Sequence, residues 1–482
     1  MIIAVGLAMC VPRLRWWVQD RVSLDRRRGA IAVGVVAALA GLVVVVPDGW
    51  LPIPQSPGLM MTPAYVGRPA AERPVSVGPI GLQPEVDTAW FGLEGCPTLA
   101  VDTHERVVAL CSDRAGPSLH VIDPDSMRKL STKVLAAPSE ESAESSCGDG
   151  DFYLDEADRA IAATADRRIL AIRTADADGE ADLTTDEAWD LTGDVPEDDC
   201  LVAVRPDRSG QIWFTTSAGL VGNLNPVSGA VKTLDLGDPI TTGLATDETG
   251  GTYVVTTHAL IRLSRGPGGG PVVDWRSVYD RGSERKSGQP SQGSGTTPTI
   301  IDGGVVAITD NAEPRMDVVF YERSSGREIC HQSVFEDDAS ATGSTLASVG
   351  EGVIVANNHG YSNAAATLLG RATSPGIARV DVAGGDCELV WTSEEIAPSS
   401  GATASVANGL AYAYTKQPTW WGVSAWYFTA LDVVTGRTVF SVRSGTGVLM
   451  DNDHGAILIA PDGAAWISTV GGLVRVRDRV RD

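Results

Sequence analysis

The stretch LVAVRPDRSGQIWFTTSAGLVGNLNPVSGAVKTLDL, residues 201–236, contains four short apolar or alternating runs separated by three turns. The turns, at residues 207–210, 217–219 and 225–229, consist mainly of Asp, Ser, Asn, Pro and Gly, which accept the backbone dihedrals that reverse a strand. Four short strands joined by such turns form an antiparallel sheet. The stretch therefore predicts one four-stranded blade of a β-propeller.

The same unit recurs along most of the chain. Clear copies lie at residues 243–265, 298–335, 346–393, 404–444 and 456–478, and weaker copies lie at 96–135 and 151–192. A sheet with two apolar faces cannot cover both alone, whereas blades packed in a closed ring cover one another. We therefore expect an all-β fold, a single β-propeller of about eight blades, with six or seven also compatible with the repeats. The last copy has three clear strands, so residues 87–93 are expected to supply its fourth.

Charge is unevenly distributed along the chain, which has a formal net charge of −23. Residues 1–46 contain six Arg and two Asp, so the remainder carries 32 basic and 59 acidic groups, a net charge of −27. A domain this acidic repels phosphate backbones. Nucleic acid is therefore not expected among its partners.

Residues 29–46, GAIAVGVVAALAGLVVVV, form an uncharged run that is long enough to span a bilayer as one N-terminal transmembrane helix. Arg26, Arg27 and Arg28 precede the run, and the positive-inside rule places them in the cytoplasm. We expect a single-pass protein of the cell membrane, and a secreted protein with a cleaved signal is the alternative. The predicted order is a basic cytoplasmic N-terminus (1–28), a transmembrane signal-anchor (29–46), a Pro-rich tether (47–86) and an extracytoplasmic propeller (87–482).

Cysteine positions fit this topology. The predicted orientation places Cys10 in the cytoplasm and leaves six cysteines in a compartment that permits disulfides. The blade register brings neighbouring strands together and predicts the pairs Cys96–Cys111, Cys147–Cys200 and Cys330–Cys387. No CxxC motif is present, which disfavours zinc binding and thioredoxin-like chemistry.

Several segments resemble known propeller families. Residues 206–229 resemble the repeat of streptogramin lyases and of gluconolactonase-type propellers, and LDVVTGRTVFSV (431–442) resembles the outer strands of pyrroloquinoline-quinone-type propellers. Residues 293–311 with 376–394 resemble an uncharacterised group of quinoprotein-like propellers from bacteria. This resemblance covers most of residues 90–478 and implies an architecture only, because binding proteins, lyases, lactonases and dehydrogenases share such repeats.

The resemblance to gluconolactonase-type enzymes implies a calcium site made of Asp and Asn oxygens at the central tunnel. Ca²⁺ prefers six to eight such oxygen ligands. The candidate ligands occupy matched places in three blades: Asp310, Asn311, Asn357, Asn358, Asp451, Asn452 and Asp453. The alternative is structural, because Asn and Asp are also the usual residues of left-handed turns.

Two further features are candidates for function. Streptogramin lyases, which residues 206–229 resemble, use a histidine as a base, so His258 is a catalytic candidate, although a histidine in a loop commonly faces solvent. Trp420 and Trp421 are placed at a hairpin tip, where they would either contact a ligand, a partner or the bilayer surface or pack against the blade, while Trp426 and Phe428 alternate into blade packing.

The sequence favours a binding or scaffold protein at the cell surface, with an unknown protein or small molecule as ligand, over an enzyme. The alternative is a calcium-dependent hydrolase or lyase of the gluconolactonase or streptogramin-lyase type. A quinone-linked oxidoreductase ranks third, because the vicinal Cys-Cys pair with which quinoprotein dehydrogenases hold their cofactor is missing from this sequence.

Overall fold

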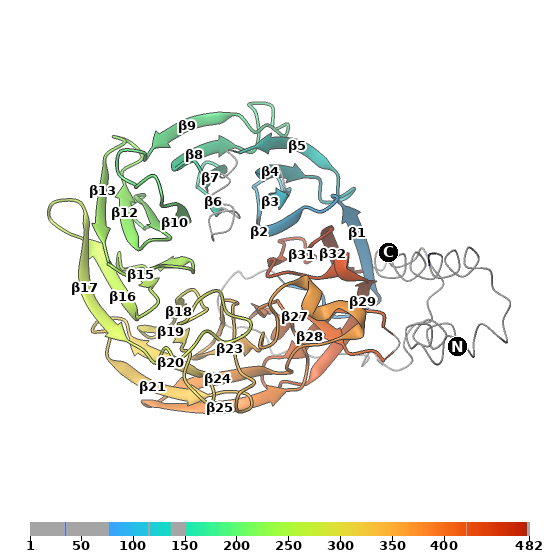
Figure 1. The fold of residues 1–482 in the computed structure, drawn as a ribbon. Coiled ribbons are helices and arrows are strands. Elements are labelled where there is room, and N and C mark those ends of the chain that lie inside the picture. Colours follow the sequence, from blue (N-terminus) through green and yellow to red (C-terminus); the bar gives the residue numbers. More distant parts are fainter. Residues whose placement is uncertain (1–33, 35–76, 114–115, 136–150, 421, 480–482) are drawn as a thin grey trace, which may run out of the picture.

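Each sequence repeat forms one antiparallel four-stranded sheet, and eight such sheets stand around a common axis (Figure 1). The computed structural model describes residues 34, 77–113, 116–135, 151–420 and 422–479. Within blades 1 to 7 the strands run in sequence from the axis outward. The fold is therefore the all-β propeller that the repeats predict, and the number of blades is eight.

The first four blades follow one another without exchange of strands. Their strands are β2 (Gly95–Val101), β3 (Val107–Asp113), β4 (Gly116–Ile122) and β5 (Lys129–Val134) in blade 1; β6 (Phe152–Leu154), β7 (Arg159–Ala163), β8 (Arg168–Arg173) and β9 (Thr185–Asp190) in blade 2; β10 (Leu201–Pro206), β11 (Ile212–Thr216), β12 (Leu220–Leu224) and β13 (Val231–Asp235) in blade 3; and β14 (Leu244–Thr246), β15 (Thr252–Val255), β16 (Ala259–Arg265) and β17 (Pro271–Val278) in blade 4.

The last four blades follow the same order, except that blade 8 takes its outer strand from the N-terminal side of the domain. Their strands are β18 (Thr299–Ile301), β19 (Val305–Thr309), β20 (Asp317–Glu322) and β21 (Glu328–Ser333) in blade 5; β22 (Ala347–Val349), β23 (Gly352–Ala356), β24 (Ile377–Ala383) and β25 (Asp386–Ser393) in blade 6; β26 (Thr403–Ser405), β27 (Leu410–Gln417), β28 (Ala425–Asp432) and β29 (Thr438–Thr446) in blade 7; and β30 (Ile457–Ile459), β31 (Ala465–Thr469), β32 (Gly472–Asp478) and β1 (Pro84–Trp90) in blade 8.

Burial follows the position of a strand in its blade. Every residue of the second strands β11, β23 and β31 is buried, because these strands contact a neighbouring blade on each face. The outer strand β5 instead alternates between half-buried and exposed residues, as expected of a strand with one solvated face. The hydrophobic core is therefore a ring of clusters between blades.

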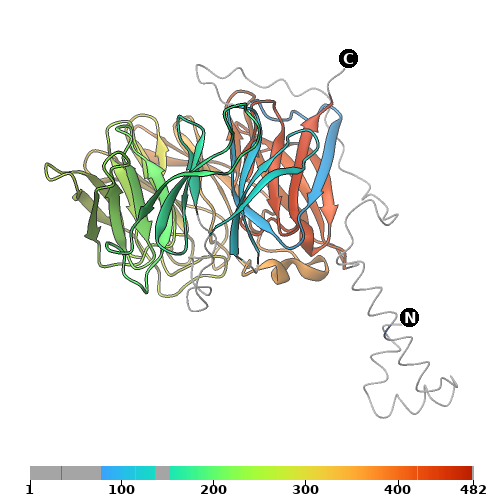
Figure 2. The ribbon, with the colours of Figure 1, turned by 90° about the horizontal axis from the view of Figure 1, so that it is seen from above.

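The two faces of the ring carry different connections (Figure 2). On one face, short turns join the first and second strands, and in blades 1 to 4 each begins with an aspartate whose Oδ1 accepts backbone N–H groups two and four residues ahead at 2.7–3.1 Å. These residues are Asp102, Asp155, Asp207 and Asp247. Because antiparallel strands alternate in direction, the long connections 279–298, 357–376 and 447–456 all lie on the opposite face.

Strand β1 closes the ring by pairing along β32, from Pro84 opposite Asp478 to Trp90 opposite Gly472 (Figure 1). The expectation that this segment supplies the missing strand is confirmed. The strand begins before residue 87 and ends at Trp90, because Gly92 has a φ of 93° and turns the chain.

Arg475 of β32 fixes this closure on both sides. Its Nη2 donates to Asp87 Oδ2 of β1 at 2.6 Å, and its Nη1 donates to the carbonyls of Pro124 and Asp125 in blade 1. The side chain is 4% exposed. One buried guanidinium thus connects blade 8, its outer strand and blade 1.

Two of the predicted disulfides are confirmed. Cys96–Cys111 joins β2 to β3, and Cys330–Cys387 joins β21 and β25, the outer strands of neighbouring blades. Cys200 is also disulfide-bonded, whereas its predicted partner, Cys147, lies outside the described residues.

Within the described part of the chain, no helix is long and apolar enough to cross a membrane. Its helical segments include two short 3-10 turns, η1 (Ala364–Gly370) and η2 (Val448–Met450). The predicted anchor, residues 29–46, lies outside the described residues except for Gly34, and it stays a prediction.

The substitution Arg475→Met tests the closure. It leaves Asp87 and two carbonyls without their donor, so we expect the free energy of unfolding to fall by about 2–4 kcal/mol. Denaturant titration followed by tryptophan fluorescence measures the change. The matched control is Arg477→Met on the same strand, where the exposed side chain pairs with Glu85 at 3.5 Å and its loss should cost less than about 1 kcal/mol. Equal effects of the two substitutions would contradict the role of Arg475.

Candidate functional site

A cavity of about 840 Å³ lies at the centre of the ring, on the face with the long connections. Its wall is formed by residues at or just before the inner strands of several blades and by the connection between blades 4 and 5. The lining residues that matter below are Asp151, Arg205, Thr242, Arg285, Lys286, Gln289, Thr345, Tyr361 and His454. The central channel thus opens into a cavity that contains ionisable and hydrogen-bonding side chains.

The connection between blades 4 and 5, residues 279–298, is held in place at its base. The hydroxyl of Tyr279 donates to the carbonyl of Thr256 at 2.6 Å and accepts the backbone N–H of Ser294 at 3.0 Å. The amide of Asn311 donates to the carbonyls of Arg281 and Glu284 at 2.8 and 2.9 Å. We call residues 280–295 the channel loop.

The tip of the channel loop contacts blade 6. The backbone N–H of Gly360 donates to the carbonyl of Ser287 at 3.3 Å. Gly288 has a φ of 99°, and a Cβ at this position would lie 2.3 Å from the carbonyl oxygen of Asn358. Only glycine allows this close approach.

The cavity contains cations and unpaired polar groups. Arg205 forms an ion pair with the buried Asp151 at 2.6 Å, whereas Arg285 is exposed to the cavity and Lys286 donates to the carbonyl of Ala312. Gln289 is 7% exposed, and neither its Oε1 nor its Nε2 has a hydrogen-bond partner. The cavity wall therefore presents donors and acceptors that the protein itself does not satisfy.

A carboxylate cluster lies beside the cavity at Tyr361. Its hydroxyl oxygen lies 3.0 Å from Asp451 Oδ1 and 2.7 Å from Asp453 Oδ1. Because a tyrosine hydroxyl carries one hydrogen, both contacts are hydrogen bonds only when one carboxyl is protonated. Burial raises the pKa of Asp451 to about 6, so Asp451 carries the second proton of this cluster in mildly acidic solution.

The segment that holds this cluster has an unusual backbone. Asp453 and His454 have consecutive positive φ values of 46° and 62°. The left-handed backbone region is unfavourable for residues other than glycine, and non-glycine residues in this conformation concentrate at functional sites. His454 lines the cavity, and desolvation by the surrounding protein lowers the pKa of its imidazole.

The seven predicted calcium ligands belong to separate local networks, and none of them lines the described cavity wall. Asp310 Oδ1 accepts the N–H groups of Ala312 and Asp317, and the amide of Asn311 holds the base of the channel loop. Asn452 donates to the carbonyls of Gly455 and Ser468.

The carboxamides of blade 6 are also engaged by the backbone. Asn357 donates to the carbonyls of Ala339 and Pro375 and accepts the N–H of Ala341. Asn358 accepts the N–H of Gly343 and donates to the carbonyl of Ala397. The structure therefore brings Asp451 and Asp453 together through Tyr361, and a Ca²⁺ site at the seven residues stays a prediction.

His258 lies away from the cavity wall. Its Nε2 accepts a hydrogen bond from Arg281 Nη1 at 2.6 Å, and its Nδ1 lies 3.1 Å from Asp238 Oδ1. Both ring nitrogens are thus engaged on the surface of blade 4. His258 is not among the described residues that line the cavity, and its catalytic role stays a prediction.

The aromatic hairpin of blade 7 divides as expected. Trp426 and Phe428 are fully buried, whereas Trp420 is 97% exposed at the tip. Trp421 lies outside the described residues.

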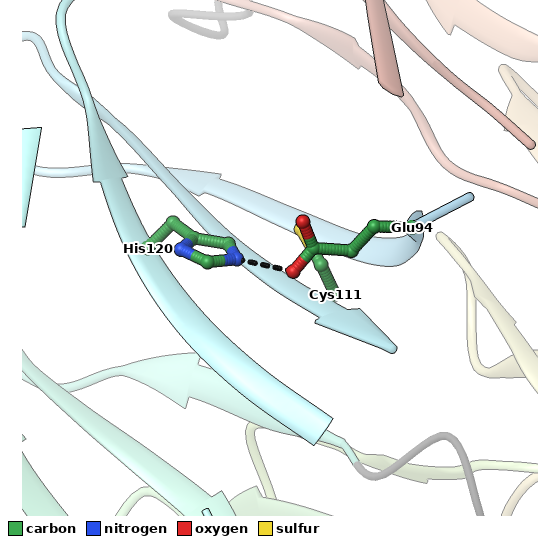
Figure 3. Close-up of side chains that lie close together, drawn as sticks. All are labelled: Glu94, Cys111 and His120. Atoms are coloured by element: carbon green, nitrogen blue, oxygen red, sulfur yellow. Dashed lines mark hydrogen bonds and ion pairs between the residues drawn. The ribbon is translucent and has the colours of Figure 1, made fainter. Parts of the chain in front are cut away.

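Two groups of three side chains with metal-ligating atoms converge in the described part of the chain. The first, Glu94, Cys111 and His120, is shown in Figure 3. Cys111 is in a disulfide and cannot supply a thiolate, and Lys129 binds the second oxygen of Glu94. Burial alone would raise the pKa of Glu94, but hydrogen bonds from His120, Lys129 and Ser118 outweigh it and lower the pKa to about 2. We interpret the group as a buried ion-pair network.

The second group consists of Asp102, His104 and Asp158, and protein donors bind both of its carboxylates. Asp102 pairs with the buried Arg106 at 2.7 Å, and Asp158 accepts a hydrogen bond from the hydroxyl of Thr103 at 2.8 Å. These bonds stabilise the turn between β2 and β3.

No model of a known protein family matches the chain. An uncharacterized protein of Archaeoglobus fulgidus is 24% identical over 314 residues, which cover 57% of this chain and 60% of that protein. The chain thus matches less than two thirds of the length of this relative. The quinoprotein-like family assignment stays a prediction.

Similar solved structures are β-propellers. BamB from Moraxella catarrhalis is 13% identical with a TM-score of 0.48 and covers 83% of this chain and 97% of its own. A catalytically inactive virginiamycin B lyase from Staphylococcus aureus, with quinupristin, is 10% identical with a TM-score of 0.45 and covers 82% of this chain and 99% of its own. At this identity the likeness concerns the fold alone.

The pKa of Asp310 gives a test of this region. Burial raises it from 3.8 to about 7, so the folded state favours the protonated acid. This contribution to stability is present below pH 3.8 and is lost as the pH rises to about 7, on the order of 4 kcal/mol. Asp310→Asn keeps the acceptor for Ala312 and Asp317 but cannot ionise.

We therefore expect the difference in unfolding free energy, Asp310→Asn minus wild type, to increase between pH 4 and pH 7. Thermal and denaturant unfolding at each pH measure it. A difference that stays constant across this range would show that Asp310 keeps an ordinary pKa.

Proposed function

We propose that this chain is a ligand-binding propeller, held outside the cytoplasmic membrane by its N-terminal segment, that takes up a small molecule in its central cavity. The observation that carries the proposal is Gln289, whose two amide atoms are buried in the cavity wall without a partner. The hydroxyl of Thr242, which also lines the cavity, is likewise unpaired.

Buried polar groups without a partner are unfavourable. Each costs about 1–3 kcal/mol, and native proteins leave few of them. Gln289 and Thr242 both line this cavity, so one bound molecule that reaches their three unpaired atoms satisfies them together. A cavity of about 840 Å³ is also within the size range of small-molecule sites.

The arrangement supports binding over catalysis. Among the described residues, no serine or threonine that lines the cavity donates a hydrogen bond to a histidine or carboxylate, the contact that activates a nucleophile. The hydroxyl of Tyr361 is engaged by Asp451 and Asp453.

The membrane part of the proposal is supported by the sequence. The uncharged run at residues 29–46 follows three arginines, and this order directs the chain after it to the outside. Disulfides in the propeller suit an oxidising compartment.

The substitution Thr345→Trp tests the binding function. Thr345 is exposed and lines the cavity, so the larger side chain should occupy the ligand's space without disturbing the core. The full chain in detergent is incubated with the low-molecular-weight fraction of a cell extract and washed, and heat-released molecules are identified by mass spectrometry. Molecules retained by the wild type should be absent from Thr345→Trp.

The matched control is Val227→Trp, at a 96% exposed position in a turn on the opposite face. It should retain the same molecules as the wild type. Equal retention by Thr345→Trp, or no retention by any variant, would refute binding in this cavity.

A further inference from the structure

We infer that the ligand of the central cavity is a small oxyanion, a molecule with carboxylate or phosphate groups and a hydroxyl, recognised by Arg285, Lys286 and Gln289 of the channel loop. This inference rests on the proposed binding function and names the chemical class of the ligand.

The charge of the cavity is opposite to that of the chain. Among the described residues that line it, three are strong cations, Arg205, Arg285 and Lys286, and one is a carboxylate, Asp151, so their formal sum is 3 − 1 = +2. The whole chain carries −23. A positive cavity in an acidic protein concentrates field lines and attracts small anions.

Two of the three cations are available to a ligand. Arg205 is committed to Asp151, whereas Arg285 makes no ion pair or hydrogen bond with any described residue. Lys286 has one protein acceptor, the carbonyl of Ala312, and an ammonium group has three donors. Desolvation lowers the pKa of Lys286, and a bound anion would favour its charged form.

The unpaired amide of Gln289 places a second, independent requirement on the chemistry of the ligand. Its Nε2 needs an acceptor, which a carboxylate or phosphate oxygen supplies, and its Oε1 needs a donor. A hydroxyl beside the anionic group satisfies the second need. The ligand is therefore expected to carry both an anionic oxygen and a hydroxyl.

The channel loop presents these three side chains from one fixed turn. The N–H of Gln289 donates to the carbonyl of Lys286 at 3.3 Å, and Gly288 packs against the carbonyl of Asn358. A loop backbone held in place before binding loses little freedom when the ligand arrives. The loop thus forms a preorganised anion-binding turn over the channel.

Isothermal titration calorimetry with the full chain in phosphatidylcholine nanodiscs tests the inference. The probes are citrate, tricarballylate, which lacks the hydroxyl of citrate, and inorganic phosphate, with sodium chloride at equal ionic strength as the blank. We expect saturable binding of citrate or phosphate. Tighter binding of citrate than of phosphate would identify the carboxylate source, and the reverse would identify phosphate.

The variant Arg285→Gln should weaken binding of the preferred probe by about tenfold to a hundredfold, the usual effect of losing a hydrogen bond to a charged group. Gln289→Leu should reduce the preference for citrate over tricarballylate to near unity. The matched control is Arg208→Gln, which removes one positive charge from an exposed turn on the opposite face and should leave binding unchanged.

Three results would overturn the inference: no saturable binding of any probe, equal weakening by Arg285→Gln and Arg208→Gln, or retention by the wild type of only uncharged molecules from the extract. In the last case loss of those molecules from Thr345→Trp would leave the binding function standing. If the extract yields no molecule that depends on the cavity and no probe binds, both the function and its ligand class are refuted.

Discussion

The structure depends on one constraint: each blade has two apolar faces, and both must be covered. A row of blades leaves two faces exposed at its ends, so only a closed ring covers all of them. The closure is made by β1 along β32 and is fixed by Arg475, which contacts Asp87 on one side and the turn of blade 1 on the other. The second strands, such as β11 and β31, are fully buried because the closed ring places a neighbouring blade on each of their faces.

Ring closure also determines where binding groups come from. The second strands and the cores between blades are occupied by packing, so most of the polar groups that line the cavity lie on connections at one end of the channel, and Arg205 comes from the inner strand β10. The channel loop supplies Arg285, Lys286 and Gln289, and the connection 447–456 supplies His454. On the opposite face, the turns between the first and second strands of blades 1 to 4 are short and capped by aspartates.

The fold could be predicted because its signals are local and repeated. Turns such as residues 207–210 and 225–229 recur at regular spacing, and that register also predicted the pairs Cys96–Cys111 and Cys330–Cys387. The site could not be predicted in this way. Asn357 and Asn358 follow a strand, where both a ligand and a turn residue are expected, and only the folded chain shows that backbone groups engage them. Gln289 lies in a loop without pattern, and the neighbouring Gly288 packs against Asn358 of blade 6, far along the chain.

The order of strands in the closing blade has a consequence for biosynthesis. Asp87 and Arg475, the partners across the seam, are 388 residues apart, so β1 is made long before β32. Until the last strand emerges, β1 has an unpaired edge and blade 1 has an uncovered apolar face, both of which favour aggregation. A chain that crosses a membrane from its N-terminus would present this open seam on the far side throughout translocation. The seam is therefore the part of the propeller that stays uncovered longest during synthesis.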